Sequence, residues 1–330
     1  NPNTAEAENS ILISGPTPFV DPAMFQNITE STILSAALKT KGSSGPSGID
    51  ADGWRRILVS KNFTAAACEV RWQRSHKRTV HQRLKPQRKI ASISPTWKLF
   101  SLSANTFRQN PGICPIGIGE VLRGIVGNAI LSVIKPDVIS SVGNLQPCAG
   151  REGGCEAAVH AMKDIFNAHS TDAVLLVDAD NAFNSLNRAV LLPIYSTFDH
   201  LWLYTYGTVT ALHPVCSFLE ARKFHHLRTT HGDPLAMSVY AIGIIPIMEV
   251  IKSDDRVKHV AFADDLSGAG NLASFEDGGK VGPKLGHYPK ASKSWPVVKP
   301  EVEDAVEQVF ADTDIKITTE GRKYLGGFIG

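Results

Sequence analysis

The sequence has few cysteines, a small net charge and no obvious targeting segment, and each of these absences excludes a class of protein. Its 330 residues contain five Cys, an odd number without CxxC spacing. This excludes a small disulfide-stapled fold and favours reduced thiols inside a cell. The net charge is only +2, so any nucleic-acid partner must be bound by local patches of charge.

Long apolar runs are also scarce. The longest that we identify, 236–248, is shorter than a bilayer requires and contains Pro246. The first ten residues are polar and show no signal peptide. We therefore expect no membrane contact and an intracellular location, nuclear or cytoplasmic. With 43% apolar and 20% charged residues, a wholly disordered chain is excluded, and 330 residues suffice for two or more lobes.

Local patterns predict a mixture of helices and strands. Helical spacing of apolar residues occurs over 28–38, 54–58, 121–135 and 156–166, the third of these ending at Lys135-Pro136. The continuous apolar run 173–177 has strand length and predicts a strand buried on both faces. Further strands are plausible over 209–218 and 222–228, and the Gly-, Ser- and Pro-containing segment 41–48 predicts a loop.

Two adjacent carboxylates, Asp264 and Asp265, end the apolar run 260–262. The run lies between Lys258-His259 and the small residues 267–270, which is typical of one strand of a hairpin. Neighbouring side chains on a strand point to opposite faces, so both Asp can approach one site only where the chain turns. Two carboxylates ~4 Å apart repel by ~4 kcal/mol at an effective dielectric of 20, so such a site needs a cation. The alternative is that both are solvated turn residues.

A third carboxylate, Asp178, directly follows the predicted strand 173–177. An Asp from a buried strand and an Asp pair from a neighbouring hairpin would build a site for two Mg²⁺ ions, which prefer hard oxygen ligands. Two such ions can activate an attacking hydroxyl and stabilise the leaving oxygen in phosphoryl transfer. Between these pieces, Asp233 is a candidate N-cap, with Pro234 at the first helical position.

The segment 71–89 contains eight Arg or Lys residues, no acid and Trp72. It is either a phosphate-contacting surface or a solvated helix face. Two sets of residues could also be drawn as zinc ligands, although neither has a usual zinc-site spacing. These sets are Cys148, Cys155 and His160, and His213, Cys216 and His225.

Seven short motifs together resemble, in the family's order, those of reverse transcriptases. The similarity covers about residues 42–330 and is specifically to the RNA-directed DNA polymerase domain of eukaryotic retrotransposons. The motifs are GPSGI at 45–49 (like GPDGI), NPGICPI at 110–116 (like the fingers motif ending in RPI), VDADNAF at 177–183, HGDPL at 231–235 (like QGDPL), FADD at 262–265 (like F/YADD), SKS at 292–294 and YLGG at 324–327 (like the primer grip). Each motif is weak alone, but seven in order are a strong signal.

This resemblance implies an α+β right-hand polymerase core with two Mg²⁺ ions, or Mn²⁺. Fingers would span 41–145 after an extension over 1–40. A palm of antiparallel sheet backed by helices would span 146–330, with 195–229 as a candidate return to the fingers. The implied partners are an RNA template, a DNA or RNA primer and dNTPs, and the oligomeric state is left open. A thumb and any nuclease or RNase H domain would lie outside this chain or be absent.

The resemblance also implies roles for the carboxylates. Asp178 and Asp264 would be the principal metal ligands, with Asp265 beside them. The carbonyl of Ala179 would be a further ligand. Asp180 is expected to solvate the turn instead.

Further residues of the motifs are implied to contact the nucleotide. Phe183 would lie beneath the incoming sugar, where its ring occupies the space of a 2′-hydroxyl; the alternative is a core Phe. Gly232, beside His231, would let the backbone approach the nascent base pair. Lys293 would neutralise or protonate departing pyrophosphate, and Arg108 would hold the triphosphate. Both cations have surface alternatives.

Two positions depart from the family pattern. Cys114 stands where the family has Arg, and His231 where it has Gln. Because of these two positions, one alternative is that the chain is a catalytically weakened or dead nucleic-acid-binding remnant of a mobile element. An RNA-dependent RNA polymerase is a second alternative, against which Phe183 speaks.

Overall fold

The computed structural model describes two compact units of an α+β protein. The described residues are 27–45, 47–60, 102–103, 118–180, 182–186, 233–252, 257–270 and 287–330. One unit takes its described residues from 138–194 and 237–330, and the other from 15–137 and 195–236. Within the described residues, the chain thus passes between the units at 137/138 and 236/237. The assignment of these units to fingers and palm remains a prediction.

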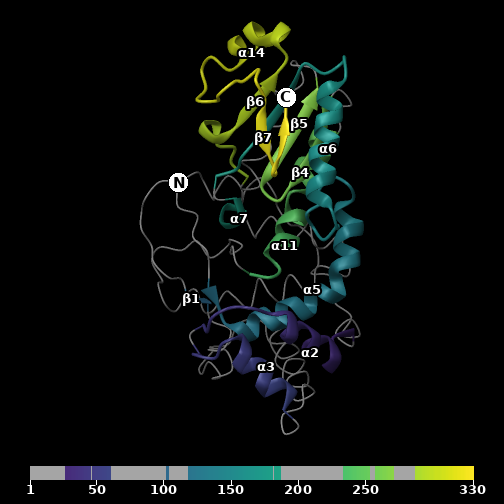
Figure 1. Ribbon diagram of the computed structural model, residues 1–330, viewed down its shortest axis with the longest axis vertical. Helices are drawn as coiled ribbons and strands as arrows, with labels where there is room; N and C mark the ends of the chain where they lie inside the picture. Colours follow the sequence, from purple (N-terminus) through teal and green to yellow (C-terminus); the bar gives the residue numbers. More distant parts are fainter. Residues whose placement is uncertain are drawn as a thin grey trace, which may run out of the picture. The chain divides into compact units, whose positions relative to one another are not determined.

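A four-stranded antiparallel sheet forms the centre of the first unit (Figure 1). Its strands, in spatial order, are β4 (Val257–Phe262), β5 (Asp265–Gly270), β3 (Ala173–Val177) and β6 (Trp295–Val298). The predicted strand 173–177 is confirmed with the same bounds. β3 lies between β5 and β6, so both of its edges are paired. Its two faces are covered by separate clusters, which bury Val174 on one face and Ala173 on the other. The hairpin is also confirmed, although the small residues expected to bound its first strand form β5 itself.

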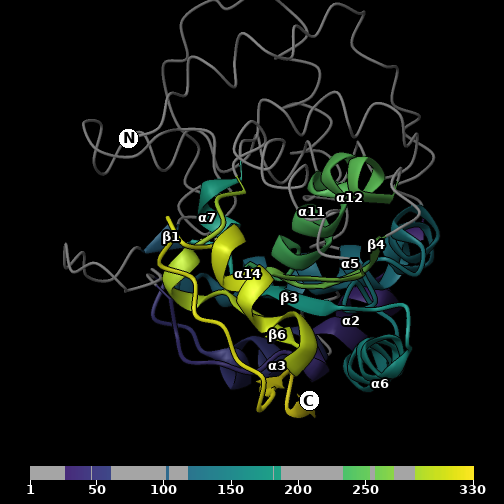
Figure 2. The ribbon, with the colours of Figure 1, turned by 90° about the horizontal axis from the view of Figure 1, so that it is seen from above.

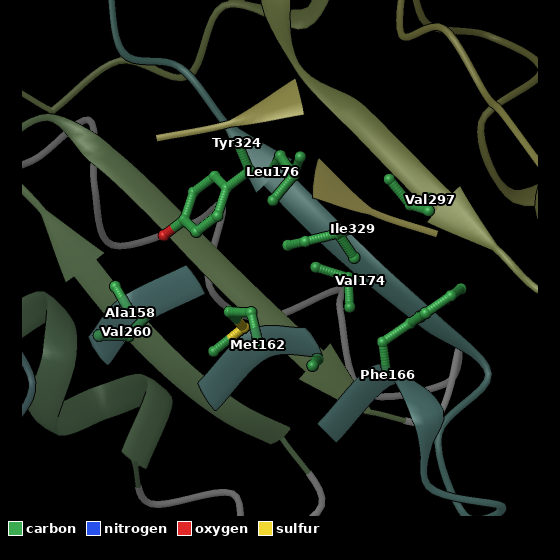
Figure 3. Packing of buried hydrophobic residues seen from close by; sticks show 10 residues of the cluster. Ala158, Met162, Phe166, Val174, Leu176, Val260, Val297, Tyr324 and Ile329 are labelled. Carbon is green, nitrogen blue, oxygen red and sulfur yellow. The ribbon is translucent and has the colours of Figure 1, made fainter. Parts of the chain in front are cut away.

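One face of this sheet packs on α6 (Gly154–Asn167) and on the hairpin of β7 (Arg322–Tyr324) and β8 (Gly327–Ile329). Figure 3 shows the shared core, in which Met162 of α6 faces Val174 and Ile329. A smaller cluster on other side chains of β3 and β6 includes Val306 of α14 (Glu303–Val309). Figure 2 shows α12 (Ile245–Lys252) on the opposite side of the sheet from α6, where it contacts β4.

The helix expected over 156–166 is confirmed as α6, but its buried face differs from the expected set. The apolar residues that gave the helical spacing over 156–166 were Ala157, Ala158, Ala161, Met162 and Ile165. Of these, Ala157 and Ala161 are exposed. The buried residues instead repeat every four positions, as Ala158, Met162 and Phe166. Small residues fit either face of a helix, so the pattern did not identify the side that packs on the sheet.

The second unit contains three described helices and a short strand pair. The elements are α2 (Glu30–Lys39), α3 (Ala51–Val59), β1 (Leu102–Ser103), β2 (Ile118–Gly119) and α5 (Val121–Val142), the last of which continues into the first unit. The helices predicted near 28–38 and 54–58 are confirmed. Thr29 and Asp50 cap them, each accepting a hydrogen bond from a backbone N–H three residues later.

The predicted end of the third helix at Lys135-Pro136 is wrong, because α5 continues through Pro136 to Val142. A proline inside a helix costs roughly 3 kcal/mol, since it removes a hydrogen bond and crowds the preceding turn. Here Pro136 lies on the exposed side, while Ile134, Val138 and Val142 continue the buried face at four-residue spacing. Burial of that face offsets the cost.

Within the described residues, α5 is also the one helix whose length and composition would suit a bilayer crossing. It is longer than the apolar run 236–248. Buried core helices pass the same test, so one such helix is weak evidence for a membrane. The expected absence of membrane contact stays a prediction.

The short helix α11 (Ala236–Gly243) begins two residues later than predicted. Asp233 still accepts a hydrogen bond through Oδ1 from the Leu235 N–H, at 2.9 Å. Its other oxygen forms a buried ion pair with Arg123 of α5, including a hydrogen bond of 2.8 Å from Nε. Asp233 therefore links α5 to the residues that directly precede α11.

Candidate active site

Three carboxylates lie at one end of the sheet of the first unit. In the antiparallel register of β3 and β5, Val177 pairs with Leu266. One step further along this register, Asp178 would lie opposite Asp265. Asp264 is in the two-residue turn between β4 and β5, whose last pair is Phe262 with Asp265. Residues 86 positions apart in the chain, Asp178 and Asp264, thus flank the same strand end.

The electrostatics of Asp265 reflect this proximity. Burial, followed by the negative charges of Asp264 and Asp178, raises the pKa of Asp265 from 3.8 to about 6. The Lys293 ammonium acts in the opposite direction. Its Nζ lies 3.4 Å from Asp178 Oδ1, and about half of the Lys293 side chain is exposed. The group is therefore partly desolvated and mutually repelling, and a bound cation would stabilise it.

The donor chemistry of this group suits Mg²⁺ or Mn²⁺. All three side chains offer hard carboxylate oxygens. Among the described residues, no three or more His, Cys, Asp or Glu side chains already converge as a ligand set. Mg²⁺ is usually held by one or two carboxylates together with waters and substrate phosphates, so it does not require such convergence.

The zinc alternative through Cys148, Cys155 and His160 has no support in the described part of the chain. Cys155 donates a hydrogen bond to the Leu325 carbonyl at 3.0 Å, whereas Cys148 contacts the turn between β4 and β5. These three residues do not form a ligand cluster there.

The segment that follows β3 is held by a second segment, 287–294. Lys290 N–H donates to the Asp178 carbonyl at 2.8 Å, and Ser294 Oγ accepts from the Asp178 N–H at 3.2 Å. Ala179 is buried and forms an isolated bridge with Pro289. Asp180 is mostly exposed and pairs with Lys290 Nζ at 2.9 Å, consistent with its expected place in the solvated turn. The motif SKS thus adjoins Asp178 through both Lys293 and Ser294.

Phe183 is half-buried in the short helix α7 (Ala182–Ser185). Its ring centroid lies 4.7 Å from that of Tyr240 in α11, at an interplanar angle of 33°. Tyr240 is fully buried, and its hydroxyl is 2.9 Å from Nδ1 of the buried His287. Burial and then the charge of Asp264 raise the pKa of Tyr240, so this aromatic pair lies within electrostatic reach of the carboxylates.

Tyr324, the first residue of the primer-grip-like motif, is a core residue. Its hydroxyl is 2.9 Å from Oγ of the buried Ser267 in β5. Burial raises the pKa of Tyr324 to about 12, to which the charge of Asp265 also contributes. The motif therefore supports the strand that carries Asp265.

Two residues contact the turn beside the carboxylates in a way that was not predicted from the sequence, where Cys148 was considered only as a zinc ligand. Gln146 is fully buried and hydrogen-bonded to Ala263, and Cys148 also contacts Ala263. Ala263 has a φ of 57°, a left-handed conformation that costs a non-glycine residue roughly 1–2 kcal/mol. A lone Gln before Pro147 carries no recognisable motif, so only the fold reveals this contact.

Several predicted features lie outside the described residues. They are Arg108, Cys114, His231, Gly232, the basic segment 71–89, the strands expected over 209–218 and 222–228, and the set His213, Cys216 and His225. Their expected roles stay predictions.

Compared with models of known protein families and with curated proteins, the sequence matches none. The fold and the site define an α+β protein with an antiparallel sheet and a carboxylate group at one end of it.

Proposed function

We propose that this chain is the catalytic core of an RNA-directed DNA polymerase of the retrotransposon type. The proposal rests mainly on one observation: Asp178, Asp264 and Asp265 lie at the same end of β3 and β5, where the pKa of Asp265 is raised. A surface turn with two solvated Asp does not require a third carboxylate from another strand. The seven motifs in the family's order support the same reading.

The proposed reaction transfers a deoxynucleotide to a primer 3′-hydroxyl and releases pyrophosphate. Asp178, Asp264 and Asp265 would hold the divalent cations, which supply positive charge to the phosphates when bound. Lys293, exposed beside Asp178, would neutralise or protonate the departing pyrophosphate. The right-hand arrangement of fingers and palm belongs to this proposal.

Primer extension on an RNA template tests it, with Asp264→Asn as the variant. We expect incorporation to fall by at least about 100-fold, because the variant loses a charged ligand oxygen. Asp180→Asn is the matched control, since Asp180 is a nearby but exposed carboxylate paired with Lys290. Equal incorporation by the wild type and Asp264→Asn would remove the carboxylates from the mechanism.

The choice of sugar distinguishes DNA synthesis from RNA synthesis. The Phe183 ring, supported by Tyr240, is the group proposed to exclude a 2′-hydroxyl. The wild type should prefer dNTP, and Phe183→Val should admit rNTP in the same assay. A wild type that prefers rNTP would favour an RNA-dependent RNA polymerase.

A catalytically dead nucleic-acid-binding remnant is the second candidate, favoured by Cys114 and His231. It predicts Mg²⁺-independent binding of primer-template without extension. Extension gained in the double variant Cys114→Arg/His231→Gln would identify the loss as a decay of the same activity.

A further inference from the structure

The turn between β4 and β5 contains a residue in a conformation that its own side chain disfavours. Ala263 and Asp264 form this two-residue turn, and Ala263 has a φ of 57°. Glycine is the residue that two-residue turns normally place at a positive φ. An Ala at this position must therefore be held by contacts from outside the hairpin.

The Gln146 side chain supplies two of those contacts. The Ala263 N–H donates to Gln146 Oε1 at 3.0 Å, and Gln146 Nε2 donates to the Ala263 carbonyl at 3.1 Å. A carboxamide carries an acceptor and a donor side by side, so it can pair with both polar groups of one residue. Gln146 has no exposed surface, so water does not compete for either hydrogen bond.

Cys148 determines the orientation of the Gln146 carboxamide. Its thiol donates to Gln146 Oε1 at 2.8 Å, and its Sγ is 2.9 Å from the Ala263 nitrogen. Burial raises the pKa of Cys148 to about 12, so the thiol keeps the proton that it donates. Two donors therefore point at Oε1, which leaves Nε2 to face the Ala263 carbonyl.

The segment that carries Gln146 is itself attached to the sheet. The Leu145 carbonyl accepts a hydrogen bond of 2.7 Å from the Ala261 N–H of β4. Because β4 is an edge strand of the sheet, this N–H would otherwise lack a strand partner. A further hydrogen bond of 3.2 Å, from the Ala149 N–H to the Gln146 carbonyl, closes a turn in the same segment. The backbone that carries Gln146 is thus held next to the turn by hydrogen bonds of its own.

We propose that Gln146 is a positioning residue, which holds the Ala263 peptide in its left-handed conformation and thereby orients the Asp264 carboxylate. Asp264 follows Ala263 directly, so rotation of the Ala263 peptide would redirect its side chain. Misplacing a catalytic group by about 1 Å can cost about 100-fold in rate. The catalytic part of this inference rests on the proposed function, whereas the structural part does not.

Amide hydrogen exchange in the metal-free protein tests the structural part. Gln146→Met keeps the length of the side chain and removes both hydrogen bonds, so exchange at the Ala263 amide should become at least about tenfold faster. The Ala269 amide in the middle of the sheet is the internal reference and should not change. Phe166→Leu, in the core of the same unit, is the matched control for general loss of stability.

Mn²⁺ alone, followed by electron paramagnetic resonance, tests the consequence for the carboxylates. We expect Gln146→Met to weaken Mn²⁺ binding about tenfold and Phe166→Leu to leave it unchanged. In primer extension, Gln146→Met should lower kcat by about 10- to 100-fold at an unchanged KM for dNTP.

If Gln146→Met does not fold, the double variant Gln146→Met/Ala263→Gly replaces it, because glycine adopts this φ without strain. It should fold and still show fast exchange at position 263. Unchanged exchange at that amide, or faster exchange with unaltered Mn²⁺ binding, would overturn the inference. A wild type that binds Mn²⁺ but never extends a primer would overturn the proposed function alone, since exchange and Mn²⁺ binding still report on Gln146.

Discussion

Several polar side chains near the carboxylates are more buried than their chemistry favours. Gln146 and Tyr240 have no exposed surface, and His287 is only 3% exposed. Each has a hydrogen-bond partner, so the cost of burial is partly offset. Tyr240 contacts Phe183, and Gln146 contacts Ala263 in the turn.

His287 should make stability depend on pH. Burial lowers its pKa from 6.5 to about 4, so as the pH falls the unfolded chain binds a proton before the folded chain does. The contribution of neutral His287 to the free energy of unfolding is therefore complete above pH 6.5. It is lost as the pH falls towards 4, by about 2 kcal/mol at pH 5. Protonation of Asp265, whose pKa is raised to about 6, acts in the opposite direction over this range. The loss is therefore measured as the difference between the wild type and a variant without His287, in denaturant unfolding at pH 7 and pH 5.

The variant His287→Gln is the control for that measurement. It keeps a hydrogen-bonding side chain next to Tyr240 but does not titrate, so its unfolding free energy should lack this loss between pH 7 and pH 5. The same change in wild type and variant would show that other groups cause the pH dependence.

At the scale of elements, the packing of α6 on β8 depends on a glycine. A Cβ added at Gly327 would overlap Val159 Cγ1 of α6 and lie 3.3 Å from its Cγ2. The primer-grip-like motif therefore has a packing reason for its second glycine, independent of any contact with a primer.

We expect Gly327→Ala to destabilise the protein by about 1–3 kcal/mol, because the helix and the hairpin must move apart. Val159→Ala removes the overlapping methyl groups, so the double variant should lose less stability than the two single variants together. Thermal or denaturant unfolding of all four proteins measures this coupling.

The control is Gly124→Ala in α5, where the nearest atom to an added Cβ is Thr40 Cγ2 at an ordinary 3.7 Å. Glycine weakens a helix relative to alanine, so this variant should stabilise the protein by about 0.5–1 kcal/mol. Additive effects of Gly327→Ala and Val159→Ala would contradict the packing argument.

At the scale of the whole molecule, charge is distributed unevenly along a nearly neutral chain. Eight of its 34 Arg and Lys residues fall within 71–89, where there is no acid, while 301–314 is rich in Glu and Asp. Any affinity for nucleic acid should therefore come from a local surface, with little contribution from the net charge.

This distribution predicts a strong dependence of nucleic-acid binding on salt. If six cations of 71–89 contact phosphates, affinity should fall roughly 10³-fold between 50 and 200 mM salt. Fluorescence anisotropy with a labelled primer-template measures the slope. Replacing Arg74, Lys77 and Arg78 by Gln should flatten it, whereas an unchanged slope would assign the contacts to another surface.

Elements whose signal is local were predicted well. The apolar run 173–177, the hairpin with Asp264 and Asp265 at its turn, and the helices α2, α3 and α6 all depend on periodicity within a few residues. The errors occurred where a neighbour outweighed a local rule. The helix α5 continues through Pro136 because its residues on both sides of the proline are buried along one face. The helix α11 begins two residues after the expected position.

By itself, the sequence determined which residue types end which strands, and hence the candidates Asp178, Asp264 and Asp265. Only the tertiary structure decided that Asp178 and Asp265 end neighbouring strands, that Tyr240 supports Phe183, and that Gln146 contacts a residue 117 positions away. The physical reason is that strand order and buried hydrogen bonds depend on which segments meet once the chain is compact. Neither composition nor local periodicity indicates which distant segments will be in contact in the folded chain.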